Sequence, residues 1–213
     1  LRHRPGVGLT FLSSGGAIYG NPAHLPAREE SPCHPISAYG ASKLMAEHHI
    51  AVFAARHGIP ARILRVSNAY GPRQSAASGQ GVVAAFLHAA ASGDSVQVVD
   101  GGRAIRDYVH VADVARAVAS LPPEEGVCEI VNVGSGRGHS VAEVLDIVER
   151  LTGTQLTIDW LPRRPGDVRE IVLDVSRLRA RMPWRPRDLE TGIAQTWQEH
   201  LGHSRRSPET LPA

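Results

Sequence analysis

Tyr39 and Lys43 are the two residues whose types and spacing most directly suggest chemistry. Lys43 is the only lysine among the 23 Lys and Arg residues of the chain. On a helix, residues four positions apart lie on the same face, so both side chains would point into the same space. A phenol alone releases its proton near pH ~10, and a neighbouring ammonium favours its ionised form. The spacing therefore predicts a tyrosine general base, with a surface lysine beside a half-buried tyrosine as the alternative.

The elements that must position this pair alternate between strands and helices. An apolar run at 9–13 is typical of a buried parallel strand, and a loop rich in Gly and Pro follows over 15–37. The helical pattern over 38–57 ends at Gly58 and carries Tyr39 and Lys43. The remaining pattern predicts strands at 61–67, 95–99, 106–111, 129–133 and 156–161, and helices at 82–92, 112–121, 139–153, 176–182 and 189–201. This alternation predicts an α/β fold.

The composition narrows the class of protein. A chain that is 42% hydrophobic and 21% charged is an ordinary soluble globular protein. The net charge is only +2 and the arginines are scattered, which argues against a nucleic-acid partner. No apolar run approaches the length of a membrane span, and the N-terminal residues do not resemble a signal peptide. Cys33 and Cys128 have no metal-site spacing and are expected to be free thiols, as in a cytoplasmic protein.

Several stretches occur in the order found in one enzyme family. They are FLSSGGAIYG (11–20), YGASKLMAE (39–47), LRVSNAYGPRQ (64–74), RDYVHVADVARAV (106–118), VNVGSGRGHSV (131–141) and PRRPGDV (162–168). With these motifs the chain resembles the extended short-chain dehydrogenases/reductases, and within them the NAD-dependent nucleotide-sugar 4-epimerases.

The resemblance implies a fold and a division of the chain. The fold would be the C-terminal part of a Rossmann-type doubly wound parallel sheet, plus a smaller α/β substrate-binding lobe. Residues 1–75 would form part of the dinucleotide-binding half. Residues 76–200 would mainly form the nucleotide-sugar lobe, with the chain crossing back to the first half, and 201–213 would be a disordered tail.

The resemblance also assigns catalytic and cofactor roles. Tyr39 would be the catalytic base, and Lys43 would hold the nicotinamide ribose of NAD and tune Tyr39. Ser13 and Ser67, each near the end of a predicted strand, would be further cofactor contacts. Lysine suits this role as a compact point charge, whereas arginine is a planar fork.

Four residues are assigned to the nucleotide sugar by the same resemblance. Arg106 and Arg164 would face the diphosphate, since guanidinium groups match phosphate oxygens. Asp167 would bind a ribose hydroxyl, and Asn68, just past a strand, would bind substrate. The alternative for each one alone is a solvated arginine or a turn-capping aspartate. Residues 80–86 should border the nucleotide base but carry no decisive pattern.

One departure from the family pattern concerns a hydroxyl group. The 4-epimerases carry Ser or Thr four positions before the Tyr of a Tyr-Gly pair, and counting back from Tyr19 gives Gly15. We expect Ser14 to replace it, with Ser13 as the alternative because alternate strand residues face opposite ways. Gly15 and Gly16 supply no acidic group there, which favours epimerisation over elimination.

A second departure concerns the dinucleotide cradle. The family pattern opens with a strand, a Gly-rich turn and a helix that bind the pyrophosphate, and none of these precedes Leu9. A strand at 9–13 would then have an open edge, an aggregation hazard unless another chain covers it. The Gly-rich stretch at 131–141 is the alternative cradle, although the resemblance places it in the substrate lobe.

Together these features predict NAD-dependent epimerisation of a nucleotide-diphosphate sugar at C4, most simply a UDP-hexose, through a transient 4-keto sugar. The rival prediction is a truncated, inactive family fragment that acts at most as a sugar-nucleotide-binding or interaction module. The expected partners are the nucleotide sugar and a second copy in a homodimer, since related enzymes pair through a helix like that carrying Tyr39. No nucleic-acid or membrane partner is expected.

Overall fold

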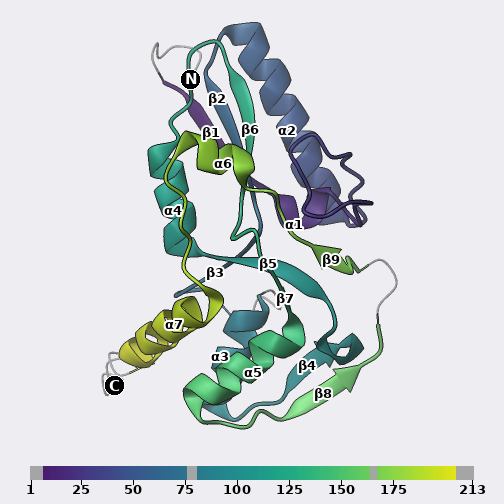
Figure 1. The fold of residues 1–213 in the computed structure, drawn as a ribbon, viewed down its shortest axis with the longest axis vertical. Coiled ribbons are helices and arrows are strands. Elements are labelled where there is room, and N and C mark those ends of the chain that lie inside the picture. The colour runs from purple at the N-terminus through teal and green to yellow at the C-terminus, as the bar shows by residue number, and fades with distance from the viewer. Residues whose placement is uncertain (1–6, 76–80, 164–166, 205–213) are drawn as a thin grey trace, which may run out of the picture.

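The computed structural model describes residues 7–75, 81–163 and 167–204 and has the predicted alternation of strands and helices (Figure 1). The strands are β1 Leu9–Ser14, β2 Ala61–Val66, β3 Asn68–Tyr70, β4 Val96–Val99, β5 Ile105–His110, β6 Cys128–Val133, β7 Gly138–Ser140, β8 Ile158–Leu161 and β9 Glu170–Ile171. The helices are α1 Gly15–Ile18, α2 Ala38–His57, α3 Val82–Ser92, η2 Asp100–Gly102, α4 Val111–Ser120, α5 Val141–Thr152, α6 Ser176–Arg181 and α7 Leu189–Ser204. The α/β class is therefore confirmed, while the short elements α1, β3, β7 and β9 were not predicted.

A three-stranded parallel sheet in the order β1-β2-β6 forms the upper part of the molecule in Figure 1. Every residue of the central strand β2 is buried, because α2 covers one face of the sheet while α4 and α6 cover the other. Leu64 and Val66 point into the apolar core with α4 and α6. On the α2 side, the guanidinium of Arg65 is buried and bonds both carboxylate oxygens of Glu47. No pattern in the sequence indicated this buried ion pair.

The second part of the molecule is built around β5. This strand pairs with β3 and β9 in parallel and with β7 in antiparallel orientation, and β4 and β8 form a separate pair. Helices α3, α5 and α7 pack together over a shared apolar core that includes Phe86, Val148 and Ile193. The lower half of Figure 1 is therefore a lobe with its own core.

Among the described residues β1 pairs only with β2, so its outer edge is open as predicted.

Helix α7 continues to Ser204, into the segment predicted as a tail, and 205–213 lie outside the described residues. Over the part of the chain that the structure describes, no helix is both long and apolar enough to cross a membrane.

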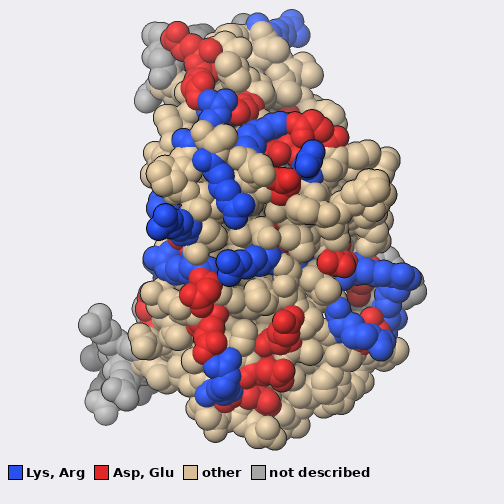
Figure 2. All heavy atoms as spheres, viewed as in Figure 1, with Lys and Arg blue, Asp and Glu red and all other residues tan. Residues whose placement is uncertain are grey.

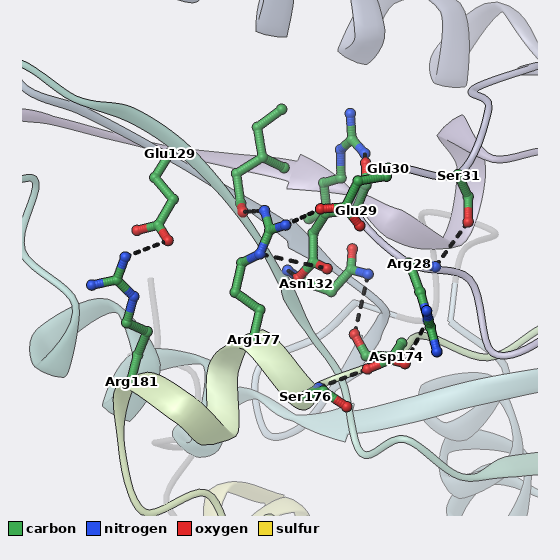
Figure 3. A network of polar contacts seen from close by, with 12 residues as sticks. Arg28, Glu29, Glu30, Ser31, Glu129, Asn132, Asp174, Ser176, Arg177 and Arg181 are labelled. Atoms are coloured by element: carbon green, nitrogen blue, oxygen red, sulfur yellow. Dashed lines mark hydrogen bonds and ion pairs between the residues drawn. The ribbon is translucent and has the colours of Figure 1, made fainter.

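An ion-pair and hydrogen-bond network ties the long loop before α2 to the sheet and to α6 (Figure 3). Arg177 of α6 donates to the carbonyl of Ile130 at 2.8 Å and forms ion pairs with Glu29 and Glu30. The Glu29 carboxylate in turn accepts the backbone N–H of Asn132 at 2.8 Å. The loop that leads into α2 is therefore fixed against β6.

His110 caps α4 and predicts a pH dependence of stability. Its Nδ1 accepts the N–H of Ala112 at 3.2 Å, so the cap needs a neutral imidazole, and the side chain is buried. Burial lowers the pKa of His110; Arg187 lowers it further, while Asp113 and Glu199 oppose the shift. A depressed pKa in the folded state gives stability that is present above the unfolded value of about 6.5 and is lost as the pH falls.

We therefore expect His110→Asn, which retains a capping oxygen, to flatten this dependence. Between pH 7.5 and 5.5 the wild-type chain should lose about 1 kcal/mol more unfolding free energy than the variant, measured by urea denaturation. His48→Asn, exposed on α2, is the matched control and should follow the wild type. Identical slopes for the wild type and His110→Asn would contradict the capping role.

Candidate functional site

The carboxyl ends of the parallel strands meet at one edge of the first sheet. Ser14 is in register with Val66, and Val66 with Val133, so the residues that follow these strands lie side by side. Ser13 is buried near this edge and its Oγ has no hydrogen-bond partner among the described residues. Ser14 is half-buried at the junction of β1 and α1, where its hydroxyl makes no cap bond. In open α/β sheets this edge is where ligands bind.

Helix α2 brings Tyr39 and Lys43 to the same edge. The Ser37 hydroxyl caps the helix by accepting the N–H of Gly40 at 3.1 Å. The Lys43 Nζ donates to the carbonyl of Leu12 at 3.0 Å and lies 5.8 Å from the centroid of the Tyr39 ring. Tyr39 itself is 52% exposed. The helical spacing thus places the pair as predicted, with the ammonium tied to β1 and the phenol open to a ligand.

Gly40 explains how α2 can begin so close to α1. A Cβ built at Gly40 would lie 2.7 Å from the carbonyl oxygen of Ala17, a contact that real side chains do not make. Only glycine therefore lets α2 pack against the turn that follows β1. This close approach positions Tyr39, one residue earlier, beside the strand end.

Gly40→Ala is expected to lower the unfolding free energy by about 1–3 kcal/mol, since backbone must move to admit the methyl group. Urea denaturation measures the loss. Ala41→Ser, at the exposed next position, is the control and should stay within about 0.5 kcal/mol of the wild type. Equal stability of Gly40→Ala and the control would show that α2 and α1 are less closely packed than the structure indicates.

Helix α1 connects this pair to the predicted substrate residues. A Cβ at Gly15 would lie 2.6 Å from Leu173 Cδ1 and 3.0 Å from the carbonyl oxygen of Arg65, so a side chain there would have to displace Leu173 and would crowd β2. A Cβ at Gly16 would lie 2.9 Å from Asn68 Oδ1. The absence of a family hydroxyl at Gly15 therefore has a steric cause, and Gly16 lets Asn68 lie directly against α1.

Asn68 and Arg106 come together in a small cavity of about 150 Å³ between β3, β5 and the start of α3. The parallel register pairs Asn68 with Tyr108, two residues beyond Arg106. The Oδ1 of Asn68 is buried without a hydrogen-bond partner among the described residues. An unpaired buried carbonyl oxygen is a point where a ligand hydroxyl could donate.

Arg106 also lines a larger cavity, of about 790 Å³, between β4, β5 and the segment around residue 168. Among the described residues, its guanidinium donates only to neutral carbonyls, those of Ile105, Val168 and Arg169, at 2.6–3.2 Å. Burial lowers the pKa of Arg106, an effect opposed by Tyr108 and Asp167. A partly buried guanidinium without a carboxylate partner is suited to bind an anion.

The charges around this larger cavity support the same conclusion. The described residues of its lining include four arginines and two aspartates; they are Arg103, Arg106, Arg163, Arg169, Asp100 and Asp167. Figure 2 shows the corresponding group of basic side chains on the β4–β8 side of the molecule. Asp167 is exposed at the cavity, whereas the predicted Arg164 lies outside the described residues. The structure therefore unites Arg106 with Asp167 but does not test Arg164.

The buried carboxylate of Asp107 was missed by the sequence prediction. It accepts hydrogen bonds from Ser135 N and Oγ, both at 2.7 Å, and from Gly136 N and Leu173 N, both at 3.2 Å. Ser67 Oγ donates to the same carboxylate at 3.3 Å, so this predicted cofactor contact has an internal partner. Burial raises the pKa of Asp107, while these hydrogen bonds oppose the shift.

Asp107 also explains the Gly-rich loop at 134–138. The amides of Ser135 and Gly136 are occupied by an internal carboxylate, and the amide of Arg137 donates to Ser135 Oγ. This loop therefore binds Asp107 in the way that a cradle binds a phosphate, and these amides are not available to a dinucleotide. An acidic residue directly after Arg106 was the only signal in the sequence.

Known enzymes resemble this chain in sequence. The model of the NAD dependent epimerase/dehydratase family matches residues 1–134. The chain is 36% identical to a UDP-glucose 4-epimerase of Azospirillum brasilense over 222 aligned positions, which cover 94% of this chain and 64% of that protein.

Two solved structures are similar in fold and sequence. The UDP-glucose 4-epimerase of Thermotoga maritima, solved with UDP-glucose, aligns with a TM-score of 0.84 and 35% identity, over 93% of this chain and 65% of that one. The UDP-glucose 4-epimerase of Thermus thermophilus, in complex with NAD, aligns with a TM-score of 0.82 and 38% identity, over 95% and 66%. The chain thus spans slightly less than two thirds of the proteins it matches, and its parallel sheet has the Rossmann-type arrangement that was predicted.

Proposed function

Because this chain belongs to the NAD dependent epimerase/dehydratase family, we propose that it carries the base and the sugar-nucleotide site of a nucleotide-sugar 4-epimerase. The observation that supports this most is an unbroken series of contacts. Gly40, beside Tyr39, packs on α1, α1 packs on Asn68, and Asn68 shares a cavity with Arg106. The proposed base and the proposed anion site are therefore connected through packed residues of this chain.

In this proposal Tyr39 removes the proton from the C4 hydroxyl of the sugar. The Lys43 ammonium places a positive charge beside this base, since it lies 5.8 Å from the centroid of the Tyr39 ring and is held by the Leu12 carbonyl. Lys43 uses one N–H in that bond and keeps two for a ligand. Ser14, at the β1–α1 junction, is our candidate for the hydroxyl that binds the reacting oxygen.

The residues at the strand edge fit the nicotinamide ribose of NAD. Ser13 offers a buried hydroxyl without a partner among the described residues, and Lys43 offers free ammonium donors beside it. When bound, the cofactor would take hydride from C4 and return it to the other face of the transient 4-keto sugar. Ser67 is the weaker candidate for a cofactor contact because its hydroxyl already bonds Asp107.

The substrate we propose is a UDP-hexose. Arg106 and the neighbouring arginines of the 790 Å³ cavity would bind the diphosphate, and Asp167 a ribose hydroxyl. Arg164 is also proposed to bind the diphosphate, because it belongs to the PRRPGDV motif at 162–168. Asn68 would accept a hydrogen bond from the sugar. These contacts hold the diphosphate while the hexose is free to turn between its two faces.

The test is interconversion of UDP-glucose and UDP-galactose by the purified chain with added NAD⁺, followed by chromatography of the sugar nucleotides. Turnover in both directions supports the proposal. Arg106→Gln should raise the KM for UDP-glucose at least about tenfold, because it removes a charge-assisted contact to phosphate. Turnover that is insensitive to Arg106→Gln and Tyr39→Phe would refute the assignment of this site.

A second candidate is a sugar-nucleotide-binding module without turnover. It is favoured by the size of the 790 Å³ cavity and by the arginines among its described lining residues, which could bind a diphosphate without a redox step. Calorimetric titration with UDP-glucose in the absence of NAD⁺ separates the two. Binding that depends on Arg106 together with no interconversion would favour the module.

We also propose that two copies pair through α2. Met45 and Val52 are 57% and 68% exposed and lie seven positions apart, so they form an apolar face opposite the buried residues of the helix. Val52→Glu is expected to weaken the dimer at least about tenfold, measured by light scattering after size exclusion. Val127→Glu, exposed in a turn, should leave the mass unchanged. A monomeric wild type would refute the pairing.

A further inference from the structure

A second basic cavity lies where the β6–β7 loop meets α6 and the connection between α6 and α7. It has a volume of about 520 Å³. Arg137 of the loop, Arg179 of α6 and Arg185 of the connection all line it. Figure 2 shows basic side chains gathered in a band over this part of the visible face. Three separate segments thus deliver an arginine to one hollow.

Within the described ranges, none of these three guanidinium groups makes a hydrogen bond or an ion pair. Other exposed arginines of the same region are paired, Arg150 with Glu190 and Arg181 with Glu129. A fourth arginine of the lining, Arg187, is also satisfied, since its Nη1 bonds Asp113 at 2.8 Å and its Nε bonds Gln195 at 3.0 Å.

The acids of the lining do not neutralise the three groups. Glu190 is engaged by Arg150. Asp188 accepts the N–H of Thr191 at 2.9 Å and its hydroxyl at 2.7 Å, which orients the carboxylate towards the start of α7. Arg137 acts on Asp188 only through space. The cavity therefore keeps an excess of positive charge. The like charges repel one another, and a bound anion would offset this repulsion.

Tyr108 separates this cavity from the one beside Asn68 and Arg106. It lines both, is only 5% exposed, and its Oη has no partner among the described residues. The backbone amides of the Gly-rich loop are occupied by Asp107 and Ser135. Recognition here must therefore come from guanidinium side chains, whose planar forks match phosphate oxygens.

We infer that the cavity formed by Arg137, Arg179 and Arg185 binds a small molecule bearing a diphosphate or two neighbouring phosphate groups. Three guanidinium groups from three segments match the charge of a diphosphate better than that of a single phosphate or carboxylate. The volume of about 520 Å³ suits a small molecule rather than an extended polyanion, which would need a basic stripe.

Calorimetric titration of the purified chain with inorganic pyrophosphate tests this inference. We expect saturable binding that weakens with added salt, and inorganic phosphate should bind about tenfold more weakly. Arg179→Gln should weaken pyrophosphate binding about tenfold, and the triple variant R137Q/R179Q/R185Q should abolish binding at this cavity. Arg56→Gln, which removes an exposed arginine of α2, is the matched control and should bind as the wild type does.

Arg106→Gln distinguishes the two basic cavities, because pyrophosphate could also enter the one proposed for the nucleotide sugar. Binding that survives Arg106→Gln and is lost in the triple variant supports the inference. Binding lost with Arg106→Gln and retained in the triple variant overturns it, as does the absence of any saturable binding. Failure of this inference leaves the proposed epimerase site untouched, since that site is tested by UDP-glucose turnover.

Discussion

Tyr39→Phe is expected to lower kcat for interconversion of UDP-glucose and UDP-galactose by about a thousandfold, because it removes the only group proposed to take the C4 proton. The ring, the helix cap at Ser37 and the contact of Lys43 with Leu12 do not involve the lost hydroxyl. The KM for the sugar nucleotide should therefore change little.

Variants of Lys43 distinguish the effect of its positive charge on kcat from the effect of its side-chain shape. Lys43→Arg keeps the positive charge but replaces a compact ammonium by a planar fork, and we expect a loss of about 10- to 100-fold in kcat. Lys43→Met, which removes the charge, should lose more activity than Lys43→Arg. Equal activity of Lys43→Arg and the wild type would contradict the need for lysine.

The control for both series is Tyr70→Phe. The Tyr70 hydroxyl is buried against α7, where it donates to the Leu189 carbonyl at 3.4 Å, so it does not reach the strand edge. Its removal should change kcat by less than about threefold. A Tyr39→Phe variant as active as Tyr70→Phe would rule out the phenol as the base.

Asp107→Ala is expected to destabilise the chain by about 3–5 kcal/mol, measured by urea denaturation. The carboxylate is 0% exposed and satisfies the amides of Ser135, Gly136 and Leu173, which come from two separate segments of the chain. Removing it leaves buried N–H groups without acceptors. For a domain stable by about 5–15 kcal/mol, such a loss is a large share of the total.

Asp107→Asn sharpens this prediction, because it keeps the shape and removes only the charge and one acceptor. Oδ1 accepts the amide of Ser135, and Oδ2 accepts those of Gly136 and Leu173. Whichever oxygen becomes the NH₂ group, its hydrogens face a backbone N–H. We therefore expect a loss of at least about 2 kcal/mol.

Two comparisons show whether this loss comes from the carboxylate. Asp146→Asn, exposed on α5, should cost less than about 0.5 kcal/mol. Ser135→Ala removes only the hydroxyl bond at 2.7 Å and should cost about 1 kcal/mol. If Asp107→Asn is as stable as Asp146→Asn, the hydrogen bonds to this carboxylate do not hold the loop as described.

The sequence by itself predicted the local elements well, because their signals are local. The helix with Tyr39 and Lys43 begins at Ala38 and ends at His57, and Gly58 follows in the left-handed conformation expected of its type. A period of 3.6 residues can be read from one segment without its surroundings. The family resemblance added Asn68 and Arg106, which the structure brings into one cavity.

The sequence did not predict the short elements, because they are too short to carry a local signal. Helix α1 and strands β3, β7 and β9 have two to four residues each, too few to show a period. They form because neighbouring strands and helices supply their hydrogen bonds and packing. The short helix α1, which packs against both α2 and Asn68, therefore fell within the predicted loop 15–37.

Only the tertiary structure decided what the charged and glycine residues do. Gly15 lacks a side chain because Leu173 and the Arg65 carbonyl occupy the space, and the Gly-rich loop holds Asp107. These partners lie about 28 to 158 positions apart in the chain, so no local pattern encodes their meeting. Spacing along one helix determined that Tyr39 and Lys43 face the same way. Packing between distant segments determined which arginines form ion pairs with carboxylates. It also determined which arginines have no such partner among the described residues, and these are the ones proposed to bind an anion.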